Sequence, residues 1–599
     1  MATVPRAATD LSKALNYKKF IALFTSEHTR DMHDRQVSVL QRVCRHNPNG
    51  FAIGDLPEVS TLITLALEKL QEGATQFVDP INAALDLCAL PFISRKSNEK
   101  ITSRDAVQQM LNLLGSLLLH PHTAIQMHAV AALTKYAQGF GESDVGDNVN
   151  TLLDLGDFQP DIKEPTCAND LRLPTRNWNQ LQLHESHCTA SAIQSFLREA
   201  NELVAFDTDQ DGQLSREELH RYKVMNDAVQ TNDDDSYDAA LEEKQQSGQN
   251  VDGEQPPPHF LVENVNFLLQ LSYSAVNARE ITESPVPSKL THLLYSVQNF
   301  REPFILMIVE LLNNLLDHTA EAVRTSGTAT SLSELLTKHR SCNAVFILGK
   351  QDNLVVFRTL LERLMVDGYR LTDKELRNDI LMACCKIVKR DSNHEHFVES
   401  GLLDFLLLYG TAAEMQSATP GNVRVFGSAH ELDFECKRLL WHLISALIDG
   451  PQQSCVAAVA ESNLGDTLLS YLDLGKPDTQ KARSLKYTVP QTHLLMEDAL
   501  SILFAIVAKC PEIFTASHGH KIILDFVQQI LDGVEAKDEA SVLKLRSLAL
   551  KLLAQSAAVP DGADTLAKEG ALPLLLDFFQ DHANSLDDRS EALRCLGSI

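Results

Sequence analysis

The sequence predicts an all-α protein built as an α-solenoid, in which stacked helical units share one continuous core. The first observation is the stretch 371–409, where a helix, a short polar break and a second helix follow one another. In the first helix apolar residues recur at spacings of three and four, which places them on one stripe. These residues are Leu376, Ile380, Leu381, Cys384, Ile387 and Val388. The second segment, Leu402 to Leu408, is apolar on almost every side, so neighbouring helices must cover it.

The second observation is that the same order returns near the end of the sequence. Gly570 is followed by a small residue and then by a Leu-rich segment that runs to Phe579, just as Gly401 precedes the segment from Leu402. Helical units that cannot bury their apolar faces alone do so by stacking. We therefore predict an armadillo- or HEAT-like solenoid, in which the Leu-rich segment forms the innermost helix of a repeat.

Composition supports this prediction and narrows the function. The 599 residues are 44% hydrophobic but only 6% aromatic, a balance that suits packed helices better than β-sandwiches. A formal net charge of −27 makes nucleic acid and anionic membranes poor partners, whereas basic protein surfaces fit. The 11 Cys lie mostly inside apolar helical patterns without paired spacing, which is typical of reduced thiols in the cytosol. No secretory signal follows Met1 and no apolar run approaches 18 residues, so we expect a soluble intracellular protein.

Changes of rhythm divide the chain into five segments. Helical patterns recur over residues 1–140 and resume over 259–599, which we predict to be N-terminal repeats and a main repeat block. Residues 141–189 are polar and interrupted by proline, so we expect an irregular connection there. Residues 190–224 hold a helix followed by a metal-binding motif. Residues 225–258 have the acidic, Gln-, Ser- and Pro-rich composition of a disordered linker.

The metal-binding motif follows a helix predicted over Ala190–Phe206 and fits the twelve-residue loop of an EF-hand. In such a loop oxygen ligands alternate along the chain, and a glycine allows the sharp turn between them. The predicted ligands are the carboxylates of Asp207, Asp209, Asp211 and Glu218, the backbone carbonyl of Gln213, and the side chain of Ser215 or a water that it holds. Gly212 stands at the turn. Hard oxygens in this order select Ca²⁺, while the alternative interpretation is a surface loop that is merely acidic.

This EF-hand has no clear partner in the sequence, although EF-hands normally pair. The nearest candidate loop, Asn232 to Glu243, has Tyr237 where glycine is needed and starts too soon after the first, so we interpret it as charged linker. We expect an unpaired hand to bind Ca²⁺ weakly or to depend on another protein for its missing half.

Other candidate sites are weaker. His184, His187 and Cys188 lack a second cluster at zinc-finger spacing, so they fit a loop with incidental histidines better than a metal site. Adjacent Cys384 and Cys385 indicate core packing, because neighbours on a helix point in different directions. We expect His394 and His396 to lie solvated in a loop, and Asn313 and Asn314 to include a buried amide that bonds neighbouring backbone. No nucleophile elbow, phosphate loop or carboxylate pair is present, so we predict that the protein is not an enzyme.

Three runs of sequence are similar to one known family. They are Ile81 to Phe92 (INAALDLCALPF), Glu375 to Leu381 (ELRNDIL) and Asp433 to Leu440 (DFECKRLL), and they occur in the family's order. The chain resembles the cilia- and flagella-associated protein 69 family, armadillo-type proteins of motile cilia. The EF-hand segment departs from that family's pattern.

The resemblance implies a structural scaffold of the axoneme, in a projection of the central apparatus, with cytoskeletal localisation in the cilium or flagellum. The implied partners are other projection proteins of the central apparatus, with microtubules contacted only indirectly and no nucleic acid or membrane. The alternative is a diffusible cytosolic adaptor that senses calcium and docks a cargo or signalling protein on its groove. The helical pattern is still running at Ile599, and family members continue further, so we expect the sequence to be the front part of a longer protein or a shortened isoform.

Overall fold

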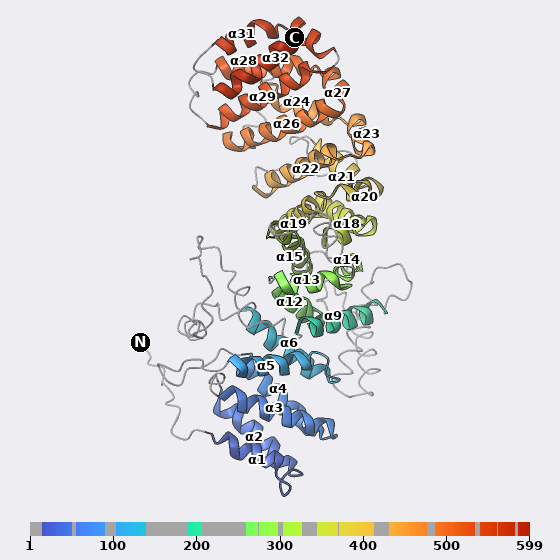
Figure 1. Cartoon of the computed structure of the whole chain (residues 1–599). Helices are drawn as coiled ribbons and strands as arrows, with labels where there is room; N and C mark the ends of the chain where they lie inside the picture. The colour runs from blue at the N-terminus through green and yellow to red at the C-terminus, as the bar shows by residue number, and fades with distance from the viewer. Residues whose placement is uncertain are drawn as a thin grey trace, which may run out of the picture. The chain divides into compact units, whose positions relative to one another are not determined.

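The computed structural model describes residues 15–48, 50, 55–89, 104–138, 188–205, 259–273, 275–296, 303–325, 344–368, 370–412, 431–475, 486–532, 540–559, 561–580 and 585–599. Within these ranges the regular structure is helical and contains no strand, as predicted. The chain divides into two compact units, Met1–Cys342 (unit 1) and Asn343–Ile599 (unit 2). This division falls inside the segment 259–599 that we predicted as one main repeat block. Figure 1 shows unit 1 in blue to green and unit 2 in yellow to red.

Unit 1 is a stack of helices that follow the predicted pattern closely. Its described helices are α1 (Tyr17–Thr25), α2 (His33–His46), α3 (Leu56–Gln71), η2 (Thr75–Phe77), α4 (Val78–Cys88), α5 (Arg104–Leu117), α6 (Thr123–Gln138), α9 (Cys188–Val204), α12 (His259–Ser272), α13 (Ala275–Glu283), α14 (Val286–Ser296) and α15 (Pro303–Thr325). Neighbours along the stack contact one another through apolar faces, for example α3 with α5 and α4 with α6. Phe77, Leu114 and Leu268 are completely buried between them.

Helix α9 belongs to the core of unit 1. It packs against α5, α12, α13 and α14, and its Cys188, Phe196 and Leu203 are fully buried. The approach to α5 is close because position 115 is glycine, where an added Cβ would lie 2.7 Å from the Cys188 sulfur. The helix predicted before the EF-hand loop is therefore present, with bounds two residues earlier than predicted at each end.

Unit 2 repeats one order of helices. Its described helices are α17 (Ala344–Leu348), α18 (Gln351–Asp367), α19 (Leu371–Ile387), η4 (Asp391–Asn393), α20 (His394–Glu399), α21 (Leu402–Gly410), α22 (Glu431–Asp449), α23 (Gln453–Glu461), α24 (Leu464–Leu472), α26 (Val489–Lys509), α27 (Pro511–Ala516), α28 (Gly519–Asp532), α29 (Ala540–Ala557), α30 (Gly562–Lys568), α31 (Ala571–Gln580) and α32 (Leu586–Ser598). From α20 onward the helices form sets of three, in which a short helix and a second helix precede a longer one. This order of helices is typical of an armadillo-type solenoid.

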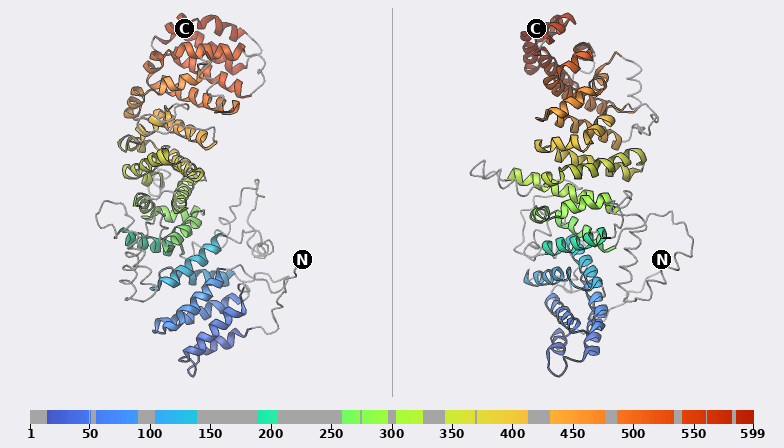
Figure 2. Two further views of the ribbon diagram at one scale, coloured as in Figure 1. Left: turned by 180° about the vertical axis from the view of Figure 1, so that it is seen from behind. Right: turned by 90° about the vertical axis from the view of Figure 1, so that its right-hand side faces the viewer.

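The longer helices α19, α22, α26, α29 and α32 contact one another in succession, and we call them the row of long helices. Figures 1 and 2 show the row stacked side by side through unit 2, from α19 to α32. The prediction that the Leu-rich segments form the innermost helices of the repeats is wrong. Helices α21 and α31 are the second helices of their sets, and the helices that continue from set to set are the long ones that follow them.

Burial confirms one Leu-rich segment more fully than the other. In α21 only Asp404 and Leu408 among its residues are exposed, and Leu403 is 1% exposed. In α31, by contrast, Leu572 and Leu576 are 39% and 44% exposed. The apolar stripe predicted on α19 is confirmed, since all six of its residues are buried.

Candidate functional site on the row of long helices

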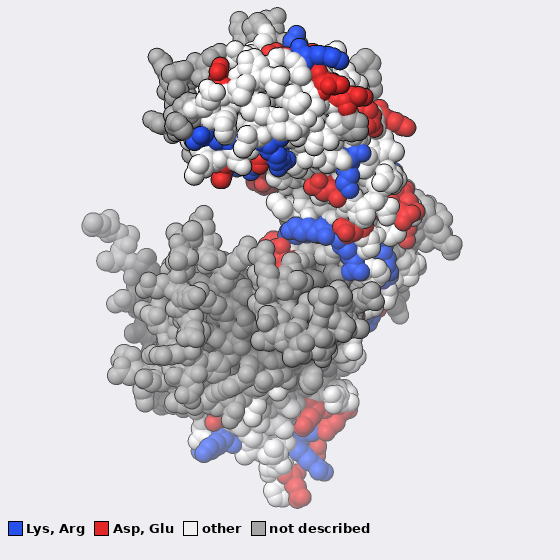
Figure 3. All heavy atoms as spheres, turned by 45° about the horizontal axis from the view of Figure 1, so that its top comes forward, with Lys and Arg blue, Asp and Glu red and all other residues white. Residues whose placement is uncertain are grey.

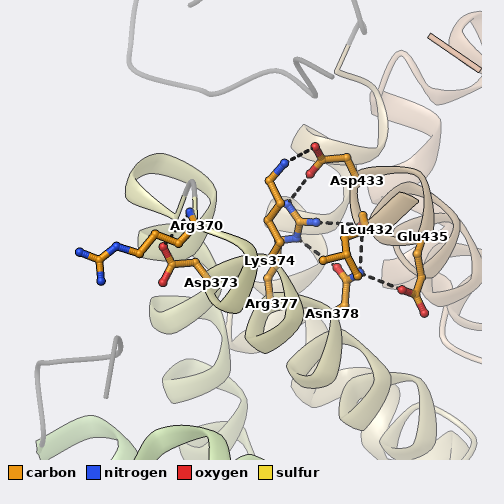
Figure 4. A network of polar contacts seen from close by, with 8 residues as sticks. All are labelled: Arg370, Asp373, Lys374, Arg377, Asn378, Leu432, Asp433 and Glu435. Carbon is orange, nitrogen blue, oxygen red and sulfur yellow. Dashed lines mark hydrogen bonds and ion pairs between the residues drawn. The ribbon is translucent and has the colours of Figure 1, made fainter. Parts of the chain in front are cut away.

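The row of long helices carries an ion pair at each of its steps, which makes it the candidate functional site. The first step, between α19 and α22, is drawn in Figure 4. Lys374 Nζ lies 2.6 Å from Asp433 Oδ2, and an Arg377 η nitrogen donates to Asp433 Oδ1 at 3.1 Å. Arg377 is 4% exposed and Asp433 5%, so this pair lies out of water, while Lys374 is partly exposed.

An amide completes the first step. Asn378 Nδ2 donates to the Leu432 carbonyl at 2.9 Å and to Glu435 Oε2 at 3.1 Å. Its Oδ1 accepts from Arg377 Nε at 3.1 Å, so all of its hydrogen-bonding capacity but one lone pair is used. Figure 4 shows Lys374, Arg377 and Asn378 of α19 reaching toward the first turn of α22. That turn is where a carboxylate such as Asp433 also faces the positive end of the helix dipole.

The remaining steps of the row are also joined by ion pairs, formed by other residues. Arg438 Nε of α22 donates to Asp498 of α26 at 2.6 Å, and Lys544 Nζ of α29 donates to Glu497 of α26 at 2.6 Å. Arg546 of α29 donates to Asp588 in the first turn of α32 at 2.9 Å. Every pair of consecutive long helices is thus joined by at least one charged hydrogen bond, the stronger class of such bonds.

We call these successive ion pairs the ladder, and two of its acids, Asp433 and Asp498, have lowered pKa values. Burial alone would raise the pKa of Asp433, but hydrogen bonds and charge from Lys374 and Arg377 outweigh it and hold the pKa below the usual aspartate range. At Asp498 burial likewise acts upward, and His442 and Arg438 together pull the pKa below its ordinary value. Both acids are therefore ionised at neutral pH, so they serve as fixed counter-charges and are unsuited to donate protons.

The charges on the face of the molecule displayed in Figure 3 are of both signs. Figure 3 shows Lys and Arg interspersed with Asp and Glu on the face that it displays. Chemically, such a face can dock a protein through several local contacts.

The six predicted calcium ligands cannot be placed. Asp207, Asp209, Asp211, Gln213, Ser215 and Glu218 all lie outside the described residues, so the EF-hand and its Ca²⁺ stay predictions. Of the preceding segment the structure places α9, which ends at Val204. In the parts of the chain that are described, no three His, Cys, Asp or Glu side chains come together as a metal site.

The predictions for thiols and histidines meet different outcomes. His184 and His187 lie outside the described residues, whereas Cys188 is buried at the start of α9 with its sulfur 3.5 Å from the Leu111 carbonyl. Core packing is confirmed for Cys384, whereas Cys385 is half-buried, and burial raises the pKa of its thiol to about 12.

The prediction that His394 is solvated is wrong. It begins α20, is 2% exposed, and its Nε2 lies 2.7 Å from the Val388 carbonyl. Glycine at position 450 leaves room for the buried His394 ring, because a Cβ added to Gly450 would lie 2.1 Å from His394 Nδ1. The glycine itself was the one sign of this close approach in the sequence. His396 is partly exposed, as expected, and pairs with Glu399 at 3.1 Å.

The predicted asparagine bond differs in kind. Asn314 is half-buried, and its Nδ2 donates to the Ser272 hydroxyl of α12 at 3.1 Å rather than to backbone. Sequence reasoning also missed the ladder as a whole. Its partners stand some 42 to 60 positions apart in the chain, and only the repeat length of the sets could have linked them.

Among the described residues one helix, α26, is long and apolar enough to cross a membrane by length and composition alone. Here α26 packs against α22, α24, α27 and α29, and its Leu495, Leu503 and Ile506 are fully buried. We therefore interpret it as a core helix of unit 2.

Comparisons with known proteins agree with the fold. The armadillo-repeat model of cilia- and flagella-associated protein 69 matches residues 15–151 and 262–535. Proteins of that name from mouse and human are 20% and 19% identical, over 86% and 87% of this chain. The chain spans less than half the length of these curated relatives, 43% and 44%.

Solved structures give only a loose superposition. An engineered protein from a structural genomics consortium covers 87% of this chain at a TM-score of 0.40 and 11% identity, and a designed armadillo repeat protein in complex with the peptide (KR)4 covers 53% at 0.32 and 15%. The fold assignment accordingly rests on the family match and on the helices themselves. With two matched blocks that cover most of its length, the chain belongs to the cilia- and flagella-associated protein 69 family and carries its armadillo repeats.

Proposed function

We propose that this protein is a non-enzymatic scaffold of the ciliary or flagellar axoneme, located in a projection of the central apparatus, where it holds neighbouring projection proteins. Family membership supports the ciliary setting. The observation that carries the scaffold role is the ladder of ion pairs, one or more between each two consecutive long helices of unit 2.

The ladder of ion pairs suits a structural scaffold for a physical reason. In a solenoid each repeat contacts only its neighbours, so the spacing of binding surfaces depends on each single interface. Apolar faces alone tolerate sliding of one helix along the next, whereas a directional pair such as Arg438 and Asp498 fixes the register. A chain of fixed steps keeps docked proteins at constant distances while the cilium bends.

The proposed partners are other central-apparatus projection proteins, with microtubules contacted only through them. The net charge of −27 favours this order, because microtubule surfaces, nucleic acid and most cytoplasmic membrane surfaces are themselves acidic. The mixed-sign surface of unit 2 fits protein partners that meet it through several small contacts.

Fractionation of motile cilia tests the location. A tagged 599-residue chain is expected to stay with axonemes after the membrane is removed with detergent, and to be lost from axonemes of cells that lack the central pair. Retention in cells without the central pair would contradict the placement in the central apparatus. Complete release by detergent from normal cilia would contradict a scaffold role and favour the diffusible adaptor instead.

The second candidate function, calcium sensing, rests on the loop 207–218. We propose that Asp207, Asp209, Asp211, Glu218, the Gln213 carbonyl and Ser215 coordinate one Ca²⁺. The support from the structure is the helix before the loop. Thr189 donates to Asn277 Oδ1 of α13 at 3.1 Å, and Arg198 donates to Gln126 Oε1 of α6 at 2.8 Å, so α9 is tied to helices on both sides.

This anchoring suggests how a single EF-hand gains support. A second hand normally stiffens the first, and here the core of unit 1 holds the helix that leads into the loop. Calcium would then act on the helices that α9 contacts, which include α5 of the first matched block and α12 of the second.

Titration calorimetry on the full chain tests the calcium proposal. We expect one site with a dissociation constant on the order of 10⁻⁵ M or weaker, lost in Glu218→Gln. Glu243→Gln, in the loop that lacks the glycine, is the matched control and should bind as the wild type does. Absence of calcium-dependent heat in the wild type, or equal losses in both variants, would refute the site without touching the axonemal proposal.

A further inference from the structure

An exposed aromatic ring flanked by cations lies at the start of unit 2. Phe346 of α17 is 45% exposed, an unusual position for a large ring on a helix that otherwise buries Ala344 and Leu348. The Arg390 guanidinium carbon lies 4.9 Å from the centre of this ring, and Lys350 Nζ lies 5.9 Å from it. Arg390 comes from the loop after α19, so two elements separated by some forty residues build the patch.

The guanidinium is held in place but not neutralised. Its Nε donates to Ser392 Oγ at 2.7 Å, and its carbon lies within cation–π distance of the Phe346 ring, so two contacts restrain it. Neither η nitrogen makes a hydrogen bond to any residue that the structure describes. A fixed guanidinium with a free fork of N–H donors is the geometry that binds a carboxylate through two parallel bonds.

Further positive charge surrounds this fork. Lys350 and Lys389 are exposed and, in the described ranges, neither forms an ion pair. Lys386 and Lys389 both lower the pKa of the Cys385 thiol, against the larger upward effect of burial, so the two cations lie near that sulfur. Asp352 and Asp391, both exposed, stand beside these cations in the sequence, and the Glu399 carbonyl accepts from Gln351, the neighbour of Lys350.

The exposed cations beside Phe346 differ from those of the row of long helices. Along the row of long helices, cations such as Arg377, Arg438 and Lys544 form ion pairs with acids of a neighbouring long helix. The chain as a whole carries a net charge of −27, so an exposed ring flanked by Arg390 and Lys350 offers positive charge on an acidic molecule. Exposed rings and arginines are also the residue types that dominate the energy of protein interfaces.

We propose that Phe346, Lys350, Lys389 and Arg390 form a docking site for an acidic peptide segment of a partner protein, in which one carboxylate pairs with the Arg390 fork. Glutamate or aspartate side chains fit the charge, and their CH₂ groups can lie on the exposed edge of the ring. The favoured ligand is a short peptide, because a nucleic acid extends its phosphates beyond the patch and meets the acidic remainder of the chain. This inference goes beyond the axonemal scaffold and does not depend on it.

Fluorescence anisotropy with the full 599-residue chain and a labelled hexaglutamate peptide tests the site. We expect saturable binding that weakens as salt is added. Arg390→Gln should weaken it about tenfold or more, because a charged two-bond contact is lost. Lys389→Gln should weaken it about threefold, since it contributes only a nearby charge.

Two further variants keep the result interpretable. Phe346→Leu retains an apolar side chain but removes the π face under the guanidinium, so we expect a loss of about threefold with an unchanged melting curve. Lys551→Gln removes an exposed lysine of α29 far along the sequence, and it should bind as the wild type does. Failure of the wild-type chain to bind, or an equal loss in Lys551→Gln and Arg390→Gln, would overturn the proposal. So would tighter binding of a single-stranded oligonucleotide of the same charge.

Discussion

In unit 1 buried neutral side chains tie several neighbouring helices, whereas in unit 2 each step of the row of long helices is tied by an ion pair. Gln36 is completely buried in α2 and donates to the carbonyls of Leu23, Thr29 and Arg30 at 3.1 to 3.2 Å, which fixes the turn from α1. Thr189 with Asn277 does similar work further along. In unit 2 the equivalent ties are the ion pairs between long helices.

This difference between neutral and charged ties predicts which substitutions destabilise each unit most. Breaking a neutral tie costs about the net free energy of one hydrogen bond, and this cost depends little on pH or salt. A buried charge that loses its partner is far more costly, because it remains desolvated. We therefore expect unit 2 to be regular and well registered at neutral pH, and more sensitive than unit 1 to changes that remove one charge.

The largest expected effect is a core substitution in unit 2. Leu403→Asp places an unpaired carboxylate among buried leucines and should destabilise unit 2 by about 4 kcal/mol or more. Leu408→Asp is the matched control, since it makes the same change on the same helix at a residue that is 52% exposed. Hydrogen exchange measured by mass spectrometry should show lost protection in unit 2 for the first variant alone. Equal protection in both variants would mean that α21 is not covered as described.

The next effect comes from the ladder. Asp433→Ala leaves Arg377 buried beside Lys374 without a counter-charge, so we expect a loss of about 3 to 5 kcal/mol by chemical denaturation. The double variant Arg377→Met, Asp433→Ala should recover most of this loss, because no buried charge then remains unpaired. A double variant as unstable as the single one would show that the pair contributes mainly packing.

The sequence predicted the helices of both units far better than their polar ties. Helical periodicity is local, so α9 and the apolar stripe of α19 could be predicted from their own residues. The Leu-rich α21 and α31 show the limit, since the same pattern is covered in one set and leaves Leu572 and Leu576 exposed in the other. Which face is covered depends on neighbours, and a single stretch of sequence does not contain that information.

The candidate site was out of reach for the same reason. Arg438 and Asp498 are ordinary surface-type residues when read in their own helices, and their pairing depends on the stacking of two long helices. His394 was mistaken for a loop residue because its burial depends on Gly450, fifty-six positions later. The calcium ligands are the opposite case: their spacing is entirely local, so the sequence alone states the hypothesis in full.

The third effect is a dependence on pH that separates the two units. The folded pKa values of Asp433 and Asp498 are held below the ordinary value, so their stabilising contribution is complete above the unfolded pKa of about 4. It is lost as the pH falls through the lower folded pKa values. Asp449 acts in the opposite direction, because burial raises its pKa, and it offsets a part of the effect.

Hydrogen exchange at pH 5 and just below pH 4 measures this effect. Peptides from unit 2 should lose protection first, and Asp433→Asn should show a smaller pH dependence than the wild type. If unit 1 loses protection at the higher pH, the contrast between neutral and charged ties does not govern acid stability.

The smallest effect tests the close packing of α9 in unit 1. Gly115→Ala gains about 1 kcal/mol of helix propensity for α5, but its Cβ would meet the Cys188 sulfur at 2.7 Å, and separating the helices costs about 1 to 3 kcal/mol. The clash should win, so we expect a net loss of about 1 kcal/mol in unit 1 and little change in unit 2. In a Cys188→Ala background the sulfur is gone, and the same substitution should then stabilise unit 1 through its propensity gain. Denaturant melts of the four chains give the coupling, and a Gly115→Ala effect of the same sign in both backgrounds would show that α9 does not approach α5 through this contact.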